Sequence, residues 1–331
     1  MNRTSFINGK TSIIKKMNEH GARREPFLFI VDYLAENAIL LTSTEQDTKN
    51  ILYSIQGRNN IPNSMPQFKK PVIKEIFPTD FENYKRQFEH IQSEIRAGNS
   101  YLANLTCATP ISLDGMLTSV FLSARAKYKL LVEDSFVVFS PETFVTIQDG
   151  MISSHPMKGT IDASIPGARE IILNDMKETA EHYTIVDLIR NDLSMVAKNV
   201  RVNRFRYIEE VRSPERNLFQ VSSEITGRLT DDYHHQLGEI LVPLLPPGSV
   251  TGAPKKKTVE ILDAVESYRR GFYCGVFGYF DGNNLDSAVS IRFIEKTADG
   301  YLYKSGGGIT MYSNAESEYQ EMLDKIYVPV T

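Results

Sequence analysis

Two pairs of glutamates with the same spacing lie far apart in this chain: Glu178 with Glu181, and Glu318 with Glu321. Each pair falls in a segment whose pattern predicts a helix, where residues three apart share a face. If the two faces meet, four carboxylates surround one point, and an all-oxygen set of ligands favours Mg²⁺. This predicts a metal-dependent enzyme with an anionic substrate, while a solvated helix face is the plain alternative for each pair.

The residues around the first pair support a partly buried site. Leu188 continues the face of Glu178 and Glu181, and buried carboxylates need a partner. His182 projects about 100° further around the helix. We therefore expect His182 to form a structural hydrogen bond and not to bind the metal.

Two glycine-containing segments could bind an anion. Gly306, Gly307 and Gly308 let backbone N–H groups approach a ligand closely, and we interpret them as a turn before a helix that a Ser313–Glu316 capping box begins. In residues 245–255, Gly248, Ser249, Thr251 and Gly252 form a polar turn before Lys255. This segment is not a phosphate-binding P-loop, because Ala-Pro precedes the lysine and no Ser or Thr follows it; an ordinary loop entering a helix is the alternative.

Glu142 and Lys158 lie on strands that we predict to be adjacent, so the two side chains could approach each other. A lysine is a nucleophile only as the free amine. Lowering its pKa from about 10.4 to roughly 7–8 costs near 4 kcal/mol, and an ionised Glu142 alone would oppose the change. A surface lysine or a salt bridge is the alternative interpretation of Lys158.

Composition limits the classes of protein. The 331 residues carry a net charge of −4 without a strongly basic region, which argues against a nucleic-acid partner. Cys107 and Cys274 form no CxxC motif, so a reducing compartment fits. The N-terminus lacks a signal-peptide core, and the apolar run 26–31 is too short to span a membrane. We expect a soluble cytoplasmic protein that does not bind a membrane.

The predicted strands occur in hairpin-like runs, as at Asp149-Gly150, and not in strict alternation with helices. This favours an α+β fold with mainly antiparallel sheets. We expect one domain over 1–331, in which a short N-terminal part (1–75) shares the core of the part with the motifs (76–331). The helices are predicted at 81–97, 171–196, 232–241, 256–266 and 314–326.

Taken together and in order, the motifs between residues 81 and 326 resemble the chorismate-utilising enzymes, which include the anthranilate, aminodeoxychorismate, isochorismate and salicylate synthases. The matching segments are Ser140-Pro-Glu142, Pro156-Met-Lys-Gly-Thr160, Ala180-Glu-His182, Val186–Asp192, Pro247–Lys255, Gly275–Tyr279, Ile291-Arg292, Gly306–Ile309 and Glu318-Tyr-Gln-Glu321 with Lys325. The resemblance implies a two-layer antiparallel β-sandwich with outer helices and the site between its sheets.

The resemblance also implies the roles of the site residues. Glu181 and Glu321 would bind Mg²⁺ directly, with Glu178 and Glu318 supporting through water, and the metal would hold the ring carboxylate of chorismate. The implied substrate-binding residues are Thr160, Ser249, Thr251, Gly252, Tyr279, Arg292, Gly306, Gly307, Gly308 and Lys325.

Lys158 selects the reaction within the family. A lysine here resembles the aminodeoxychorismate synthases, in which it would be a covalent nucleophile, with Glu142 as general acid/base and a glutamine amidotransferase partner supplying ammonia. Anthranilate synthase is the alternative enzyme, and a non-catalytic relative that binds chorismate or tryptophan is the alternative of another class. Leu102 and Phe219 depart from the residues that relatives carry at the aligned positions near the substrate ring.

Overall fold

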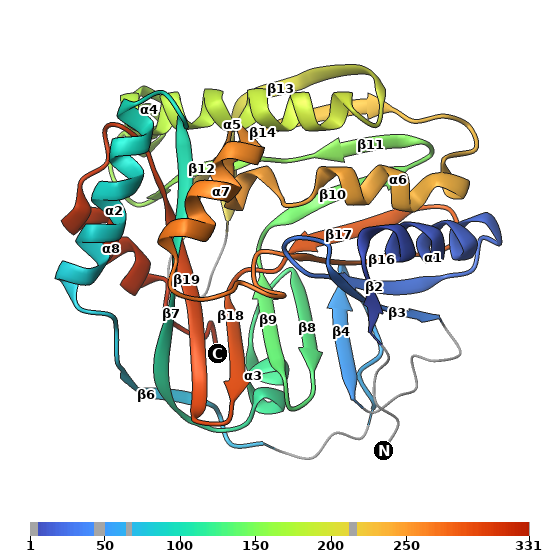
Figure 1. Cartoon of the computed structure of the whole chain (residues 1–331), viewed down its shortest axis with the longest axis horizontal. Coiled ribbons are helices and arrows are strands. Elements are labelled where there is room, and N and C mark those ends of the chain that lie inside the picture. The colour runs from blue at the N-terminus through green and yellow to red at the C-terminus, as the bar shows by residue number, and fades with distance from the viewer. Residues whose placement is uncertain (1–5, 43–49, 64–67, 212–216, 331) are drawn as a thin grey trace.

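The structure is a computed structural model that describes residues 6–42, 50–63, 68–211 and 217–330. Two antiparallel sheets stand face to face (Figure 1). The first has the strand order β1-β3-β2-β16-β17-β10-β11-β14-β12, with β13 on β14. Its strands are β1 (Ile7–Asn8), β2 (Phe27–Val31), β3 (Asn37–Thr42), β10 (Thr143–Gln148), β11 (Met151–Ser154), β12 (Met157–Asp162), β13 (Lys198–Val211), β14 (Leu218–Arg228), β16 (Val276–Phe280) and β17 (Leu285–Val289).

The second sheet has the order β15-β7-β19-β18-β9-β8-β4-β5, with β6 on β7. Its strands are β4 (Ile51–Ile55), β5 (Arg58–Asn59), β6 (Val72–Ile76), β7 (Leu102–Asp114), β8 (Tyr128–Val132), β9 (Phe136–Ser140), β15 (Gly252–Ala253), β18 (Phe293–Thr297) and β19 (Gly300–Ile309). The helices are α1 (Lys10–Ala22), α2 (Phe81–Arg96), α3 (Leu117–Ser123), α4 (Ala168–Asn174), α5 (Met176–Ser194), α6 (Leu237–Leu241), α7 (Lys255–Val265), α8 (Ala315–Asp324) and the 3₁₀ helices η1 (Tyr233–Gln236), η2 (Val242–Leu244) and η3 (Gly248–Val250).

The predicted α+β fold with two antiparallel sheets and outer helices is confirmed. The N-terminal strands belong to both sheets: β2 pairs with β16, and β4 pairs with β8. Every residue of β2 is buried, as expected for a continuous apolar run in the middle of a sheet. None of the helices in the described residues is long and apolar enough to cross a bilayer.

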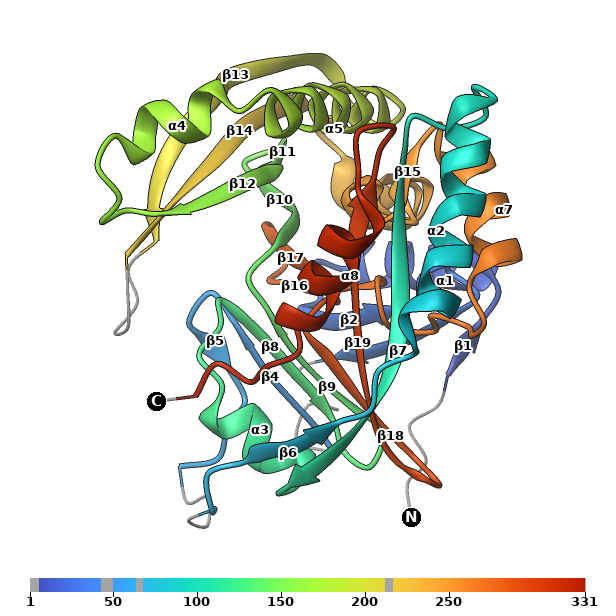
Figure 2. The ribbon, with the colours of Figure 1, turned by 90° about the vertical axis from the view of Figure 1, so that its left-hand side faces the viewer.

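Two apolar cores hold the layers together. One lies on the inner side of the sheets and includes Phe29, Ile147 and Phe277. The other, with Phe88 and Leu262, lies between the second sheet and the helices α2, α7 and α8; Figure 2 shows α2 and α7 side by side next to β7. Because α8 packs on β19 and α5 packs on β12 and β14, each acidic helix lies against a different sheet.

Three sequence predictions were wrong in detail, and one helix was missed. The helix expected at 171–196 is two helices, because Asp175 caps α5 by accepting a hydrogen bond from the Glu178 N–H at 2.8 Å. The glycine triplet is not a turn: it is the end of β19, paired with β7. The residue that caps α8 is Asn314 and not Ser313. Helix α1, which we did not predict, lies against α6 and η1.

A buried ion pair joins the second sheet to the segment after α7. The Arg270 guanidinium bonds both carboxylate oxygens of Glu266 at 2.6 and 2.8 Å, and it donates to the carbonyls of Asn104 and Val250. Glu266 in turn accepts from the N–H and hydroxyl of Thr106. The two charged side chains are only 3% and 4% exposed, so each depends on the other for its charge balance.

Replacing Arg270 by Met should therefore lower the free energy of unfolding by about 3–5 kcal/mol, because it leaves a buried carboxylate unpaired. The neighbouring Arg269 is exposed, so Arg269→Met is the matched control and should stay within about 0.5 kcal/mol of the unaltered protein. Denaturant unfolding followed by circular dichroism measures both values. Equal stabilities of the two variants would contradict this assignment.

Candidate active site

A cavity of about 420 Å³ brings together residues from both sheets and both acidic helices. Most of the predicted site residues line it. They are Glu142, Lys158, Thr160, Glu178, Glu181, Ser249, Arg292, Gly306, Gly308, Glu318, Glu321 and Lys325.

Four predicted residues do not line this cavity, and one of them is Gly307, which lies next to Glu318 and Glu321. Tyr279 stacks on Tyr53 at 5.7 Å between ring centroids and lies in a separate groove with Arg58. Thr251 is buried and accepts a hydrogen bond from the Tyr33 hydroxyl. Gly252 has a structural function: a Cβ there would lie 1.9 Å from the carbonyl oxygen of Leu102.

The cavity includes residues that the sequence did not single out, among them Tyr273, Gln220, Asn104 and Lys304. Tyr273 is 3% exposed and precedes β16, six residues before Tyr279. Lys304 is 2% exposed and its ammonium pairs with Glu295 at 2.9 Å. The alternation of side chains along β19 was a usable signal for Lys304, because it shares a face with Gly306 and Gly308; no comparable signal distinguishes Tyr273 from Tyr279.

A β-bulge in β12 directs Lys158 into the cavity. The pairing of β12 with β14 shifts between Met157 and Thr160, so two residues of β12, Lys158 and Gly159, oppose one of β14. Gly159, within the bulge, has a φ of 83°, which a residue with a side chain rarely adopts. Glu142 lies in the connection before β10, so the expectation that it and Lys158 occupy adjacent strands was wrong, although both side chains reach the same cavity.

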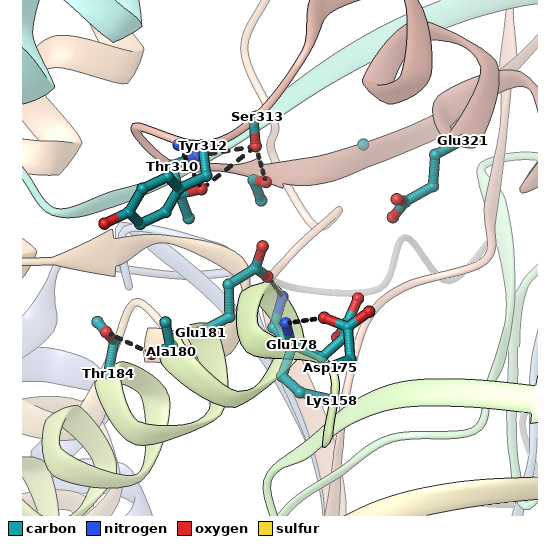
Figure 3. A network of polar contacts seen from close by, with 12 residues as sticks. Lys158, Asp175, Glu178, Ala180, Glu181, Thr184, Thr310, Tyr312, Ser313 and Glu321 are labelled. Atoms are coloured by element: carbon teal, nitrogen blue, oxygen red, sulfur yellow. Dashed lines mark hydrogen bonds and ion pairs between the residues drawn. The ribbon is translucent and has the colours of Figure 1, made fainter. Parts of the chain in front are cut away.

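The ammonium of Lys158 contacts the Glu181 carboxylate at 3.0 Å, as Figure 3 shows. Burial disfavours the charged amine, but the carboxylates of Glu181, Glu178 and Glu321 outweigh it and raise the pKa of Lys158 above its ordinary value. In this arrangement Lys158 is therefore protonated at neutral pH and is not yet a nucleophile.

The glycine triplet lies between the two glutamate pairs. Because glycine has no side chain, it leaves open the space in front of their carboxylates. A Cβ on Gly308 would lie 3.3 Å from the Lys158 Nζ and 3.8 Å from Glu181, whereas a Cβ on Gly307 would lie 3.4 Å from Glu318. Consecutive residues of a strand face opposite sides. The pairs therefore approach β19 from either side, and side chains at these positions would occupy the space that the carboxylates face.

The four glutamates fit a magnesium site by residue type, since they offer only oxygen atoms, and all of them line one cavity. Within the described ranges, however, no three Asp, Glu, His or Cys residues lie close enough together to hold a metal ion. Glu181 contacts Lys158, and Glu321 contacts the Lys325 ammonium at 2.7 Å. Two of the four carboxylates thus have a lysine ammonium as a partner in this structure.

Glu142 has the environment of a carboxyl that can carry a proton. Burial raises its pKa, opposed by a short hydrogen bond from the Ser249 hydroxyl and by the charges of Lys158, Arg292 and Lys325. A carboxyl whose pKa is raised suits a general acid.

Arg292 contributes a guanidinium to the lining of the cavity. Its guanidinium lies 5.4 Å from the ring centre of Tyr327, and it forms no ion pair with any carboxylate among the described residues. Its backbone has a φ of 55°, a conformation that costs about 1–3 kcal/mol and concentrates at functional sites.

His182 has the structural role that we predicted. Its Nε2 lies 2.6 Å from the hydroxyl of Ser223, which also accepts from the Arg206 backbone N–H. Burial, with the charges of Arg206 and Lys158, lowers the pKa of His182 to about 4. It is therefore neutral at pH 7.

The two departures from the family pattern lie in different places. Leu102 is buried beside the cavity, with its Cδ1 3.1 Å from where a Gly308 Cβ would be. Phe219 does not line the cavity, contrary to our expectation: its ring lies under the Arg169 guanidinium, and its neighbour Gln220 lines the cavity instead.

The lowered pKa of His182 predicts how stability depends on pH. Below about pH 6.5 the unfolded chain binds a proton at this histidine that the folded protein excludes. The free energy of unfolding should therefore fall by about 2 kcal/mol through His182 alone between pH 7 and pH 5. Denaturant unfolding at both pH values should show this loss in the unaltered protein and in the exposed-site variant His90→Gln, but a smaller loss in His182→Gln; equal losses in all three would be the contrary result.

Comparison with known proteins identifies the family to which this chain belongs. The chain matches the family described as chorismate binding enzyme over residues 15–331. It is 44% identical over 317 residues to an uncharacterized PabA-like protein from Haemophilus influenzae, and the aligned region covers 96% of each protein. It is 34% identical over 259 residues to aminodeoxychorismate synthase component 1 from Salmonella typhimurium, which covers 73% of this chain and 56% of that protein.

The fold is also similar to a solved structure. A protein described as a 2,3-dihydroxybenzoate-specific isochorismate synthase from Bacillus anthracis superimposes with a TM-score of 0.73 at 18% identity, over 98% of this chain and 90% of that one. At this identity the likeness concerns the fold. The match of the family to nearly the whole chain decides the assignment: this chain belongs to the chorismate binding enzymes.

Proposed function

We propose that this chain is the chorismate-converting component of an aminodeoxychorismate synthase, and that it makes 4-amino-4-deoxychorismate from chorismate and ammonia. The observation that carries the proposal is Lys158, which the bulge in β12 directs into the cavity beside Glu181. The 34% identity to aminodeoxychorismate synthase component 1 supports it. A glutamine amidotransferase that supplies the ammonia is part of the proposal.

Lys158 would act as a covalent nucleophile. Its neutral amine attacks C2 of the chorismate ring, both ring double bonds shift, and the C4 hydroxyl leaves. Glu142 donates the proton with which this hydroxyl leaves as water, which its raised pKa favours. Ammonia then adds at C4, both double bonds shift back and Lys158 is released. One difficult substitution thus becomes two easier ones.

The contact between Lys158 and Glu181 sets a condition on this chemistry. A protonated Lys158 cannot attack, so the charge of Glu181 must first be neutralised by something other than the lysine. Mg²⁺ held by Glu181 and Glu321, with Glu178 and Glu318 supporting through water, would supply that positive charge and hold the ring carboxylate. Burial would then be the main remaining influence on the pKa of Lys158, and burial favours the neutral amine.

The remaining cavity residues would hold the substrate. Chorismate carries two carboxylates, and Arg292 would bind the one on the enolpyruvyl group. Lys325 donates to the carbonyl of Gly306 at 2.7 Å and to Glu321, which fixes the backbone of β19 relative to α8. Tyr273, and not Tyr279, is the tyrosine that lines the substrate cavity.

Product identification tests the proposal. The purified chain is incubated with chorismate, ammonium and Mg²⁺, and the products are separated by chromatography and identified by mass. We expect 4-amino-4-deoxychorismate, and no conversion in the presence of a chelator. Glutamine should replace ammonium only when an amidotransferase is added.

Each other outcome points to a named alternative. Anthranilate as the product would contradict the proposed reaction in favour of anthranilate synthase. Tight binding of chorismate without any conversion would indicate a non-catalytic relative. Full activity in the presence of the chelator would contradict the role of the four glutamates.

A further inference from the structure

Three adjacent lysines begin α7, and only the first of them has a buried partner. Lys255 contacts Asp192 of α5 at 2.6 Å and donates to the carbonyl of Leu244 at 2.9 Å. Its side chain is 16% exposed and that of Asp192 is 10% exposed. Lys256 and Lys257 are exposed. A buried ion pair of this kind needs a reason beyond stability, because an apolar pair of the same size is often as stable.

Lys255 closes the loop that contains Ser249. The loop leaves η2 at Leu244 and ends at Pro254, so the contact of Lys255 with the Leu244 carbonyl ties the end of the loop to its start. The same ammonium ties the loop to α5, the helix of Glu178 and Glu181, through Asp192.

The loop also packs closely against α5 at Gly248. A Cβ on Gly248 would lie 2.7 Å from a methyl group of Leu188 and 3.4 Å from a carboxylate oxygen of Asp192. The backbone one residue before Ser249 therefore rests directly on the acidic helix. A shift of α5 at this level would move the Ser249 hydroxyl with it.

Ser249 is the side chain that holds the Glu142 carboxyl. Its hydroxyl donates to Glu142 Oε1. Glu142 lines the substrate cavity, and it also lines a small cavity of about 30 Å³ whose lining includes Asp192, Gly248 and Ser249. Space of this size holds one or two water molecules. Since close-packed side chains do not fill the space beside Glu142, its orientation depends on the hydrogen bond from Ser249.

We propose that the Lys255–Asp192 ion pair is a positioning device for the reaction: it fixes the loop of residues 244–254 on α5, so that Ser249 holds the Glu142 carboxyl toward the substrate. The inference rests on the role of Glu142 in the proposed function. It gives Lys255 and Asp192 a function although neither lines the substrate cavity.

The test observes Glu142 directly and needs no turnover. With ¹³C-labelled glutamate carboxyl carbons, the Glu142 resonance is identified by its loss in Glu142→Gln and followed against pH. The groups that face Glu142 are Ser249, Lys158, Arg292 and Lys325, and the Ser249 hydrogen bond stabilises its charged form. Ser249→Ala and Lys255→Met should each raise the titration midpoint of Glu142 by about one pH unit.

The double variant separates positioning from general loosening. If Lys255 acts through Ser249, then Ser249→Ala with Lys255→Met should shift the midpoint no further than Ser249→Ala alone. Asp192→Asn, which keeps the shape of the side chain, should give a smaller shift in the same direction and remains informative if Lys255→Met does not fold. Lys257→Met, whose lysine lies on the surface, should leave the midpoint unchanged.

The inference also predicts a change in the kinetics of chorismate consumption. Chorismate consumption, measured whatever the product, should lose at least about tenfold in kcat for Lys255→Met, with a smaller change in KM. An unchanged Glu142 midpoint in both Lys255→Met and Asp192→Asn would overturn the inference. Because the midpoint is read without substrate, that result is distinct from a failure of the proposed reaction.

Discussion

The contact between the Lys158 ammonium and the Glu181 carboxylate governs the whole site. It places the most acidic region of the cavity beside the one residue whose neutral form the proposed reaction needs. While the contact persists, Lys158 keeps its proton and cannot act as the nucleophile of the proposed reaction. The charges of the two glutamate pairs therefore control the pKa of Lys158. Neutralising the carboxylates would lower that pKa and so favour the neutral amine.

The fold brings the two glutamate pairs to the cavity from opposite sides of β19. Helix α5 packs on the first sheet and α8 on the second, and β19 passes between their carboxylates. Only a strand without side chains at residues 307 and 308 leaves that space open. The bulge in β12 then directs Lys158 toward it, and the loop with Ser249 closes the cavity beside Glu142.

Much of this was predictable from sequence. The family resemblance predicted that Lys158, Glu142, Arg292 and the acidic pairs share one site, and all of them line one cavity. Hairpin signals indicated the α+β class. The sequence did not show that the glycine triplet is a strand, because glycine favours turns locally and only pairing with β7 overrides that preference. It also could not distinguish Tyr273 from Tyr279, since both lie in one buried segment and only the tertiary fold decides which faces the cavity.

The central claim is that Lys158 is a nucleophile and not only the partner of Glu181. The most direct measurement is intact-protein mass spectrometry after incubation with chorismate and Mg²⁺ but without ammonia, followed by peptide mapping. The account predicts an adduct of chorismate minus water on Lys158, absent from Lys158→Ala and from Lys158→Arg, whose guanidinium cannot lose its proton. A protein that converts chorismate with ammonia, yet never carries the adduct and stays active as Lys158→Arg, would contradict it.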